Sequence, residues 1–160
     1  RIVEQDSRMA SWQGDKGGVI AYGSMYGHTA AMAETLAAML AERGVRTIRM
    51  HDLSYAQKGS VLADVMRYDT LVVASPTYNG ELFPPVASFV SALIERGIEN
   101  RTVGVMGSYS WGPMAAKKLA AAFDGSKVSV LAPSPMLRQN LLSEVESDIE
   151  ALADAIVATL

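Results

Sequence analysis

The first residues that could do chemistry form a short run of small and hydroxyl-bearing side chains, Gly23-Ser24-Met25-Tyr26-Gly27-His28-Thr29. The run leaves an apolar strand and enters a helical pattern, so its backbone N–H groups can surround an anion at the helix start. The hydroxyls of Ser24 and Thr29 can donate to the same phosphate. The run lacks the Lys of nucleoside-triphosphate loops and the Gly-x-Gly-x-x-Gly of dinucleotide loops. A monophosphate site and an ordinary capped turn both remain open.

Two later runs combine polar, aromatic and small residues after apolar strands. They are Ser75-Pro76-Thr77-Tyr78-Asn79-Gly80 and Gly107-Ser108-Tyr109-Ser110-Trp111-Gly112. A planar heterocycle could take backbone hydrogen bonds from the run at 75–80 and stack on the aromatic rings of the run at 107–112. Turn chemistry alone also explains the run at 75–80, and a surface turn with incidental aromatics also explains the run at 107–112. Taken together, the three runs favour one crevice for a flat, phosphorylated ligand.

The elements that must position these runs alternate between strand and helix. The apolar runs predict strands at 19–22, 45–50, 71–74, 103–106 and 128–131. Helical spacing predicts helices at 29–43, 60–67, 84–96, 113–123 and 142–160. This alternation predicts an α/β three-layer sandwich, with a parallel sheet covered by helices on both faces.

The polarity of the strands predicts their order in the sheet. The second and fifth strands carry charged and polar residues and are expected at the edges, whereas the other three are apolar throughout. The prediction is therefore a five-stranded sheet of order 2-1-3-4-5. In this order the chain reverses direction between strands 1 and 3, and ligands of open α/β sheets bind beyond the carboxyl ends of the strands at such a point.

Composition limits the remaining choices. The 160 residues suffice for one domain, and the net charge of −3 predicts no nucleic-acid partner. The apolar runs are too short for a bilayer, so we expect no membrane partner. The absence of Cys excludes disulfides and iron–sulfur ligation and is compatible with a cytoplasmic location. We expect residues 1–16 to be a linker or the tail of a preceding domain and residues 17–160 to form the ligand-binding domain.

The three runs resemble those of flavodoxins, and most closely those of the C-terminal flavodoxin domain of A-type flavoproteins, the flavodiiron proteins. The resemblance covers roughly residues 17–160. The strings that carry it are Tyr22-Gly23-Ser24-Met25-Tyr26-Gly27-His28-Thr29 with the following Met32-Ala33-Glu34, Ala74-Ser75-Pro76-Thr77-Tyr78-Asn79-Gly80, and Gly107-Ser108-Tyr109-Ser110-Trp111-Gly112. The resemblance implies a flavodoxin-like fold with FMN as the cofactor.

The resemblance also implies a role for each run. The residues implied to hold the phosphate are Ser24, Met25, Tyr26, Gly27, His28 and Thr29. Those implied to line the ring and ribityl chain are Ser75, Pro76, Thr77, Tyr78, Asn79 and Gly80. Those implied to flank the isoalloxazine are Ser108, Tyr109, Ser110, Trp111 and Gly112, with Tyr109 or Trp111 as the stacking residue. Two positions depart from the family pattern: His28 stands where Asn is common, and Gly23 stands where an acidic residue is common.

The implied function is electron transfer. Rubredoxin or a flavin reductase would reduce the FMN, which would pass electrons to a di-iron, β-lactamase-like domain that reduces oxygen or nitric oxide. That domain would lie in the same polypeptide or across a homodimer. It needs several His ligands, whereas this chain has only His28 and His51. We therefore expect no metal site and no catalytic side chains here, and an oxidoreductase component that is not catalytically complete alone.

Three alternatives stay open. An NAD(P)H:quinone oxidoreductase shares the fold and the phosphate run but needs room for nicotinamide over the flavin ring, a face that Tyr109 and Trp111 would tend to cover. A response-regulator-like domain needs an acidic residue at the end of the third strand, where this chain has Ala74-Ser75. A module whose flavin site has decayed into a protein-binding surface is the third.

Overall fold

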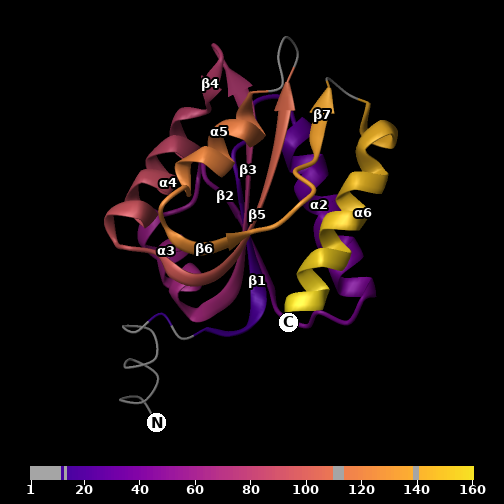
Figure 1. Ribbon diagram of the computed structural model, residues 1–160. Helices are drawn as coiled ribbons and strands as arrows, with labels where there is room; N and C mark the ends of the chain where they lie inside the picture. The colour runs from indigo at the N-terminus through magenta and orange to yellow at the C-terminus, as the bar shows by residue number, and fades with distance from the viewer. Residues whose placement is uncertain (1–11, 13, 110–113, 139–140) are drawn as a thin grey trace.

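The computed structural model describes residues 12, 14–109, 114–138 and 141–160. In these ranges a twisted sheet lies between two layers of helices (Figure 1). The strands are β1 (Asp15–Tyr22), β2 (Ile48–Asp52), β3 (Tyr68–Tyr78), β4 (Glu81–Leu82), β5 (Glu99–Tyr109), β6 (Lys127–Val130) and β7 (Met136–Arg138). The helices are α2 (His28–Glu42), α3 (Lys58–Arg67), α4 (Pro84–Glu95), α5 (Ala115–Ala122) and α6 (Leu142–Thr159). The α/β sandwich that the alternation predicts is confirmed.

The sheet differs from the predicted five-stranded sheet of order 2-1-3-4-5. It has seven strands in the described residues, with the path β2-β1-β3-β5-β6, while β4 pairs with β3 and β7 pairs with β5. The pairs along the path are parallel, and β4 alone runs antiparallel to its partner. The prediction missed β4 and β7 because strands of two and three residues are too short to show an apolar period.

Alternating side chains of the central strands fill two cores. Val19, Leu71 and Val103 face the layer of α3, α4 and α5. Ile20, Val72 and Met106 point to the opposite face and pack on α2 and α6. Because successive strand residues point to opposite faces, the part of a strand that is buried on both sides must be apolar or small at every position, as 19–21, 71–74 and 103–106 are.

Several strands extend beyond their predicted bounds. β1 begins at Asp15 rather than at Val19, so the last two residues of the expected linker, 15 and 16, belong to the sheet. β3 and β5 each have 11 residues and continue into the runs expected to be loops. The ends of β3 and β5 first pair with each other, at Ser75–Gly107 and Pro76–Ser108. Beyond that, β4 pairs with the end of β3, and β7 pairs with the end of β5. Within the described residues no helix combines the length and apolar character needed to cross a bilayer.

Candidate functional site

The start of α2 is built to receive an anion. Gly27 precedes the helix with φ 84°, a left-handed conformation that glycine adopts without strain. It has no side chain to cap the helix, and the first turn contains no acidic residue. The Oγ of Ser24 accepts the N–H of Gly27 at 3.0 Å and so closes the loop. The first N–H groups of α2 therefore remain available to a ligand such as a phosphate.

The side chains around this helix start are unequally exposed. Tyr26 is 81% exposed and Met25 is 37% exposed, so both project from the loop. His28 is half-buried. Thr29 is buried, and its Oγ1 lies 2.7 Å from the Oγ of Ser108 at the end of β5. The predicted phosphate residues are thus together at one helix start, and one of them is tied to the third run.

The second run is held by Ser75. Its buried hydroxyl donates to the carbonyl of Pro76 at 2.8 Å and accepts the N–H of Phe83 at 3.1 Å. Asn79 and Gly80 have φ of 50° and 76°, the left-handed values of a two-residue hairpin turn, and they join β3 to β4. Ser75 thus holds the β3–β4 hairpin to the residue that follows it, Phe83. Its hydroxyl already makes two hydrogen bonds within the protein.

Thr77 has an unpartnered polar atom. Its Oγ1 is buried and has no hydrogen-bond partner in the described part of the chain. A buried hydroxyl without a partner costs free energy, and native proteins rarely leave one. Thr77 lies one residue before the half-exposed Tyr78 and follows the buried Ser75–Pro76 pair. A bound ligand with a donor or acceptor at this point would satisfy the hydroxyl.

Two aromatic rings shape the hairpin. Tyr78 is 40% exposed, and its ring meets that of Phe83 edge-on at 6.1 Å between centroids. Phe83 was not among the predicted site residues. A large apolar residue directly before Pro84-Pro85 is the signal that could have identified it, because a proline restricts the backbone of the preceding residue to extended conformations.

The third run is described only in part. Ser108 and Tyr109 end β5, with Ser108 buried and Tyr109 half-buried. Ser110, Trp111 and Gly112 lie outside the described residues, so stacking on Trp111 stays a prediction. In the register of the sheet Ser108 pairs with Pro76 of β3 and with Leu137 of β7. The second and third runs are therefore neighbours, as predicted.

One side of the site is acidic. Tyr22 ends β1 beside the first loop. Burial raises the pKa of its phenol, and the carboxylates of Asp52 and Glu34 raise that pKa further. Tyr22 therefore remains a neutral phenol at physiological pH. Elsewhere at this end, Lys118 of α5 pairs with Glu81 of the hairpin at 2.7 Å between Nζ and Oε2.

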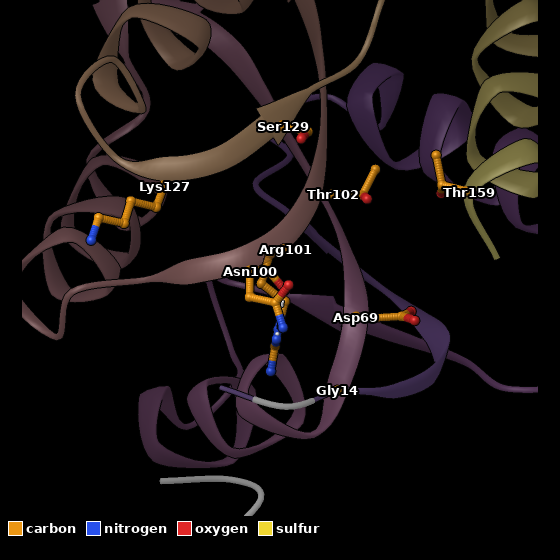
Figure 2. Close-up of a pocket in the computed structure, with 8 residues that line it drawn as sticks. All are labelled: Gly14, Asp69, Asn100, Arg101, Thr102, Lys127, Ser129 and Thr159. Atoms are coloured by element: carbon orange, nitrogen blue, oxygen red, sulfur yellow. Dashed lines mark hydrogen bonds between the residues drawn. The ribbon is translucent and has the colours of Figure 1, made fainter. Parts of the chain in front are cut away.

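A separate cavity of about 360 Å³ lies at the opposite end of the sheet. Its lining residues come from the amino-terminal parts of β3, β5 and β6 and from the end of α6 (Figure 2). Buried Arg101 lies beside it, with its guanidinium donating to the carbonyls of Trp12 and Val65 at 2.7 and 2.9 Å. Since those donors already have acceptors in the chain, we assign this cavity no ligand.

The described residues contain no group of three or more His, Cys, Asp or Glu side chains arranged to hold a metal ion. The features at the carboxyl ends of β1, β3 and β5 instead suit an organic phosphate with a flat ring. They are an uncapped helix start, an unpartnered buried hydroxyl and a half-exposed aromatic ring. These three features fit FMN, which has an anionic phosphate at one end and a planar ring at the other.

Comparison with known proteins agrees with this fit. The sequence profile of the family described as Flavodoxin matches residues 20–152. The chain is 30% identical over 139 residues to a nitric oxide reductase from Moorella thermoacetica, a match that covers 86% of this chain and 35% of that protein. The chain thus spans about a third of the length of this relative.

Solved structures share the fold. The rubredoxin oxygen:oxidoreductase of Desulfovibrio gigas superposes with a TM-score of 0.83 at 22% identity, over 94% of this chain and 38% of that one. The flavodiiron protein of Giardia intestinalis superposes with a TM-score of 0.79 at 21% identity, over 98% of this chain and 40% of that one. The resemblance to the flavodoxin domain of flavodiiron proteins is confirmed, and the chain belongs to the flavodoxin family, whose members bind FMN.

Proposed function

We propose that this chain is an electron-transfer domain whose FMN lies across the carboxyl ends of β1, β3 and β5. The observation that carries the proposal is the arrangement of three segments on neighbouring strands. The uncapped start of α2 follows β1, the unpartnered hydroxyl of Thr77 lies in β3, and Ser108 and Tyr109 end β5. Strands β1, β3 and β5 are adjacent and parallel in the sheet, so the three segments lie side by side at the carboxyl ends of these strands.

The role of each segment follows from its chemistry. The N–H groups of His28 and Thr29, with the hydroxyl proton of Ser24, would hold the phosphate. Thr77 and the backbone of Asn79 and Gly80 would meet the polar edge of the ring. Tyr78 and Tyr109 would limit the space on its faces, and the predicted contributions of Ser110, Trp111 and Gly112 would complete the third segment. Ser75 and Pro76, which are buried in β3, would hold this segment in place.

Bound FMN would supply the redox chemistry, accepting and donating electrons while the protein adjusts its potential. The chain itself needs no acid–base residue for this. Its side chains would bind, orient and shield the ring. The carboxylates of Asp52 and Glu34 lie near enough to Tyr22 to raise its pKa, so they place negative charge on that side of the site. Negative charge near a flavin disfavours the addition of electrons to it.

The partners are part of the proposal. The titles of two similar structures name rubredoxin, oxygen and a flavodiiron protein. We propose rubredoxin or a flavin reductase as the electron donor and a di-iron, β-lactamase-like domain as the acceptor, in the same polypeptide or across a homodimer. Asp15 and Lys16 belong to β1, so the proposed connection to that domain is limited to residues 1–14.

Anaerobic mixing of the FMN-loaded chain with reduced rubredoxin tests the proposal. We expect the visible absorption band of the oxidised flavin to bleach by about one electron equivalent per rubredoxin oxidised. A loaded chain that is inert to reduced rubredoxin and to a flavin reductase, yet turns over NADH with a quinone, would instead support the quinone oxidoreductase. A chain that does not retain FMN would contradict both functions.

A further inference from the structure

All the sulfur of this chain is in methionine side chains. The sequence contains nine methionines and no cysteine. In the part of the chain that the structure describes, three methionines are exposed: Met25 and Met50 at 37% each and Met114 at 40%. Met32 and Met106, in contrast, are fully buried in the core beneath α2 and α6. Because an oxidant in solution reaches exposed thioethers first, methionine oxidation is expected to begin at the three exposed side chains.

The three exposed methionines lie in different parts of the fold. Met25 lies in the loop between β1 and α2, two residues before Gly27, and Met114 directly precedes α5. Met50 lies in β2, at one end of the main sheet path. Met25 and Met50 therefore have the same exposure, but only Met25 belongs to the loop proposed to hold the phosphate.

The loop that contains Met25 has free hydrogen-bond donors and few acceptors. The Oγ of Ser24 already accepts the N–H of Gly27 at 3.0 Å. No side chain caps α2, and its first turn has no acidic residue, so the N–H groups of His28 and Thr29 have no acceptor among the described residues. A thioether sulfur is only a weak acceptor, so the reduced Met25 side chain leaves these donors to a ligand.

Oxidation turns this weak acceptor into a strong one. Hydrogen peroxide is the oxidant: a sulfur lone pair attacks one peroxide oxygen, the O–O bond breaks and an S–O bond forms. The proton of the transferred oxygen passes to the leaving hydroxide, which departs as water, so the sulfur loses two electrons and the peroxide gains them. The sulfoxide oxygen carries the negative end of the S–O dipole. Three rotatable bonds allow it to reach N–H groups of the adjacent helix start.

We propose that Met25 is a redox modification site, whose sulfoxide weakens FMN binding by competing with the phosphate for the N–H groups of His28 and Thr29. The inference rests on the FMN site described above and adds a means of regulating it. The partial negative charge of the sulfoxide oxygen also opposes the phosphate at the positive end of the α2 dipole. The modification is reversible, because methionine sulfoxide reductases return the sulfoxide to the thioether.

Peroxide treatment of the full, FMN-free chain tests this site. Peptide mass spectrometry measures sulfoxide at each methionine, and quenching of flavin fluorescence measures the FMN dissociation constant before and after treatment. We expect sulfoxide at Met25, Met50 and Met114 before any forms at Met32 and Met106. FMN binding should weaken by about tenfold, the effect of losing one hydrogen bond to a charged group.

Enzymatic reduction should reverse the effect. Treatment with the two stereospecific methionine sulfoxide reductases and a thiol reductant should remove the sulfoxide and restore the FMN dissociation constant. The chain has no cysteine, so the thiol reductant has no disulfide of its own to act on.

Single substitutions identify the methionine responsible. Each variant is compared with itself before and after peroxide, so any effect of the substitution alone cancels. Met25→Leu, which keeps the side-chain volume but has no sulfur, should change its FMN dissociation constant by less than about twofold on treatment. Met50→Leu is the matched control, since Met50 has the exposure of Met25, and it should lose affinity as the wild type does. Met114→Leu should do the same.

The outcomes separate this inference from the function on which it rests. A wild-type chain that binds FMN, carries sulfoxide at Met25 and keeps its affinity overturns the modification site and leaves the FMN site intact. An undiminished loss of affinity in peroxide-treated Met25→Leu overturns it equally, as does a Met25 that stays reduced while Met50 is oxidised. An untreated wild-type chain that does not bind FMN overturns the proposed function and the modification site with it.

Discussion

Gly23 and Phe83 pack so closely that no side chain fits between them. A Cβ at position 23 would lie 2.7 Å from Cδ2 of Phe83 and 2.7 Å from Cγ2 of Val86. Phe83 also contacts the ring of Tyr78, and its N–H is held by Ser75. A side chain at position 23 would therefore have to displace Phe83 or Val86. The contact between Gly23 and Phe83 seats the β3–β4 hairpin on the end of β1.

Gly23→Ala should loosen this hairpin. We expect a loss of unfolding free energy on the order of 1–3 kcal/mol, typical of an overpacked site, and a weaker FMN complex. Urea denaturation and a fluorescence titration with FMN measure the two effects. Gly18→Ala in β1, the strand that Gly23 follows, is the control, because a Cβ there would meet no atom within 4 Å. Equal stability of the two variants would contradict the packing argument.

Thr77→Val should affect the free and loaded protein in opposite directions. Removing a buried, unpartnered hydroxyl is expected to stabilise the FMN-free chain by about 1 kcal/mol. The same change should weaken FMN binding by about fivefold to tenfold, because a contact with the ligand is lost. Thermal unfolding with and without FMN gives both values. A variant that is destabilised without FMN would show that the hydroxyl already has a partner.

Arg101→Met should destabilise the fold without affecting the flavin site. The buried guanidinium donates to the carbonyls of Trp12, Val65, Met66 and Asn100, and it stacks 5.2 Å from the centre of the Trp12 ring. Its loss should cost on the order of 3 kcal/mol in urea denaturation.

Arg96→Met is the control for this change, since Arg96 is exposed and bonds one carbonyl at 3.3 Å. It should cost less than about 0.5 kcal/mol. The flavin site lies at the other end of the sheet, so the FMN dissociation constant of Arg101→Met should match the wild type. A large change in that constant would be the contrary result.

Asp69 should make stability depend on pH. Burial raises the pKa of its carboxyl and outweighs the hydrogen bond from the Gly17 N–H and the charge of Arg101. A raised pKa in the folded state contributes stability below the ordinary aspartate pKa, and that contribution is lost as the pH rises through the raised value. Asp69→Asn should therefore stabilise the chain at about pH 7, and the gain should shrink at about pH 3, below the ordinary value of about 3.9.

Urea denaturation at the two pH values tests this prediction. Asp148→Asn, which removes an exposed carboxylate from α6, serves as the control for the change in net charge. If Asp69→Asn lowers the stability at about pH 7, the hydrogen bonds and the charge of Arg101 outweigh burial, and the direction of the shift is wrong.

The periodic elements of this fold could be predicted from the sequence, because burial imposes a repeat that is visible locally. Continuous apolar runs such as Val19–Tyr22 predicted inner strands, and the polar second and fifth strands are the two ends of the main sheet path. The three runs of the site could also be found, since small, hydroxyl and aromatic residues follow each inner strand.

Features that depend on distant partners could not be predicted. Nothing near Arg101 indicates that its guanidinium is buried against a carbonyl 89 residues away. The Thr29–Ser108 bond and the Phe83 contact with Gly23 arise in the same way, from side chains that meet only after folding. The strand character of Thr77 and Tyr78 depends on β4, a strand of two residues that has no period of its own.

The most direct test of the central claim is the absorption spectrum of the purified chain after incubation with excess FMN and desalting. The FMN site predicts retained flavin bands and about one FMN released per chain on denaturation, with the yield reduced in Gly23→Ala and preserved in Gly18→Ala. A folded but colourless wild-type chain would contradict it, and a site that has decayed into a protein-binding surface would then be the better account.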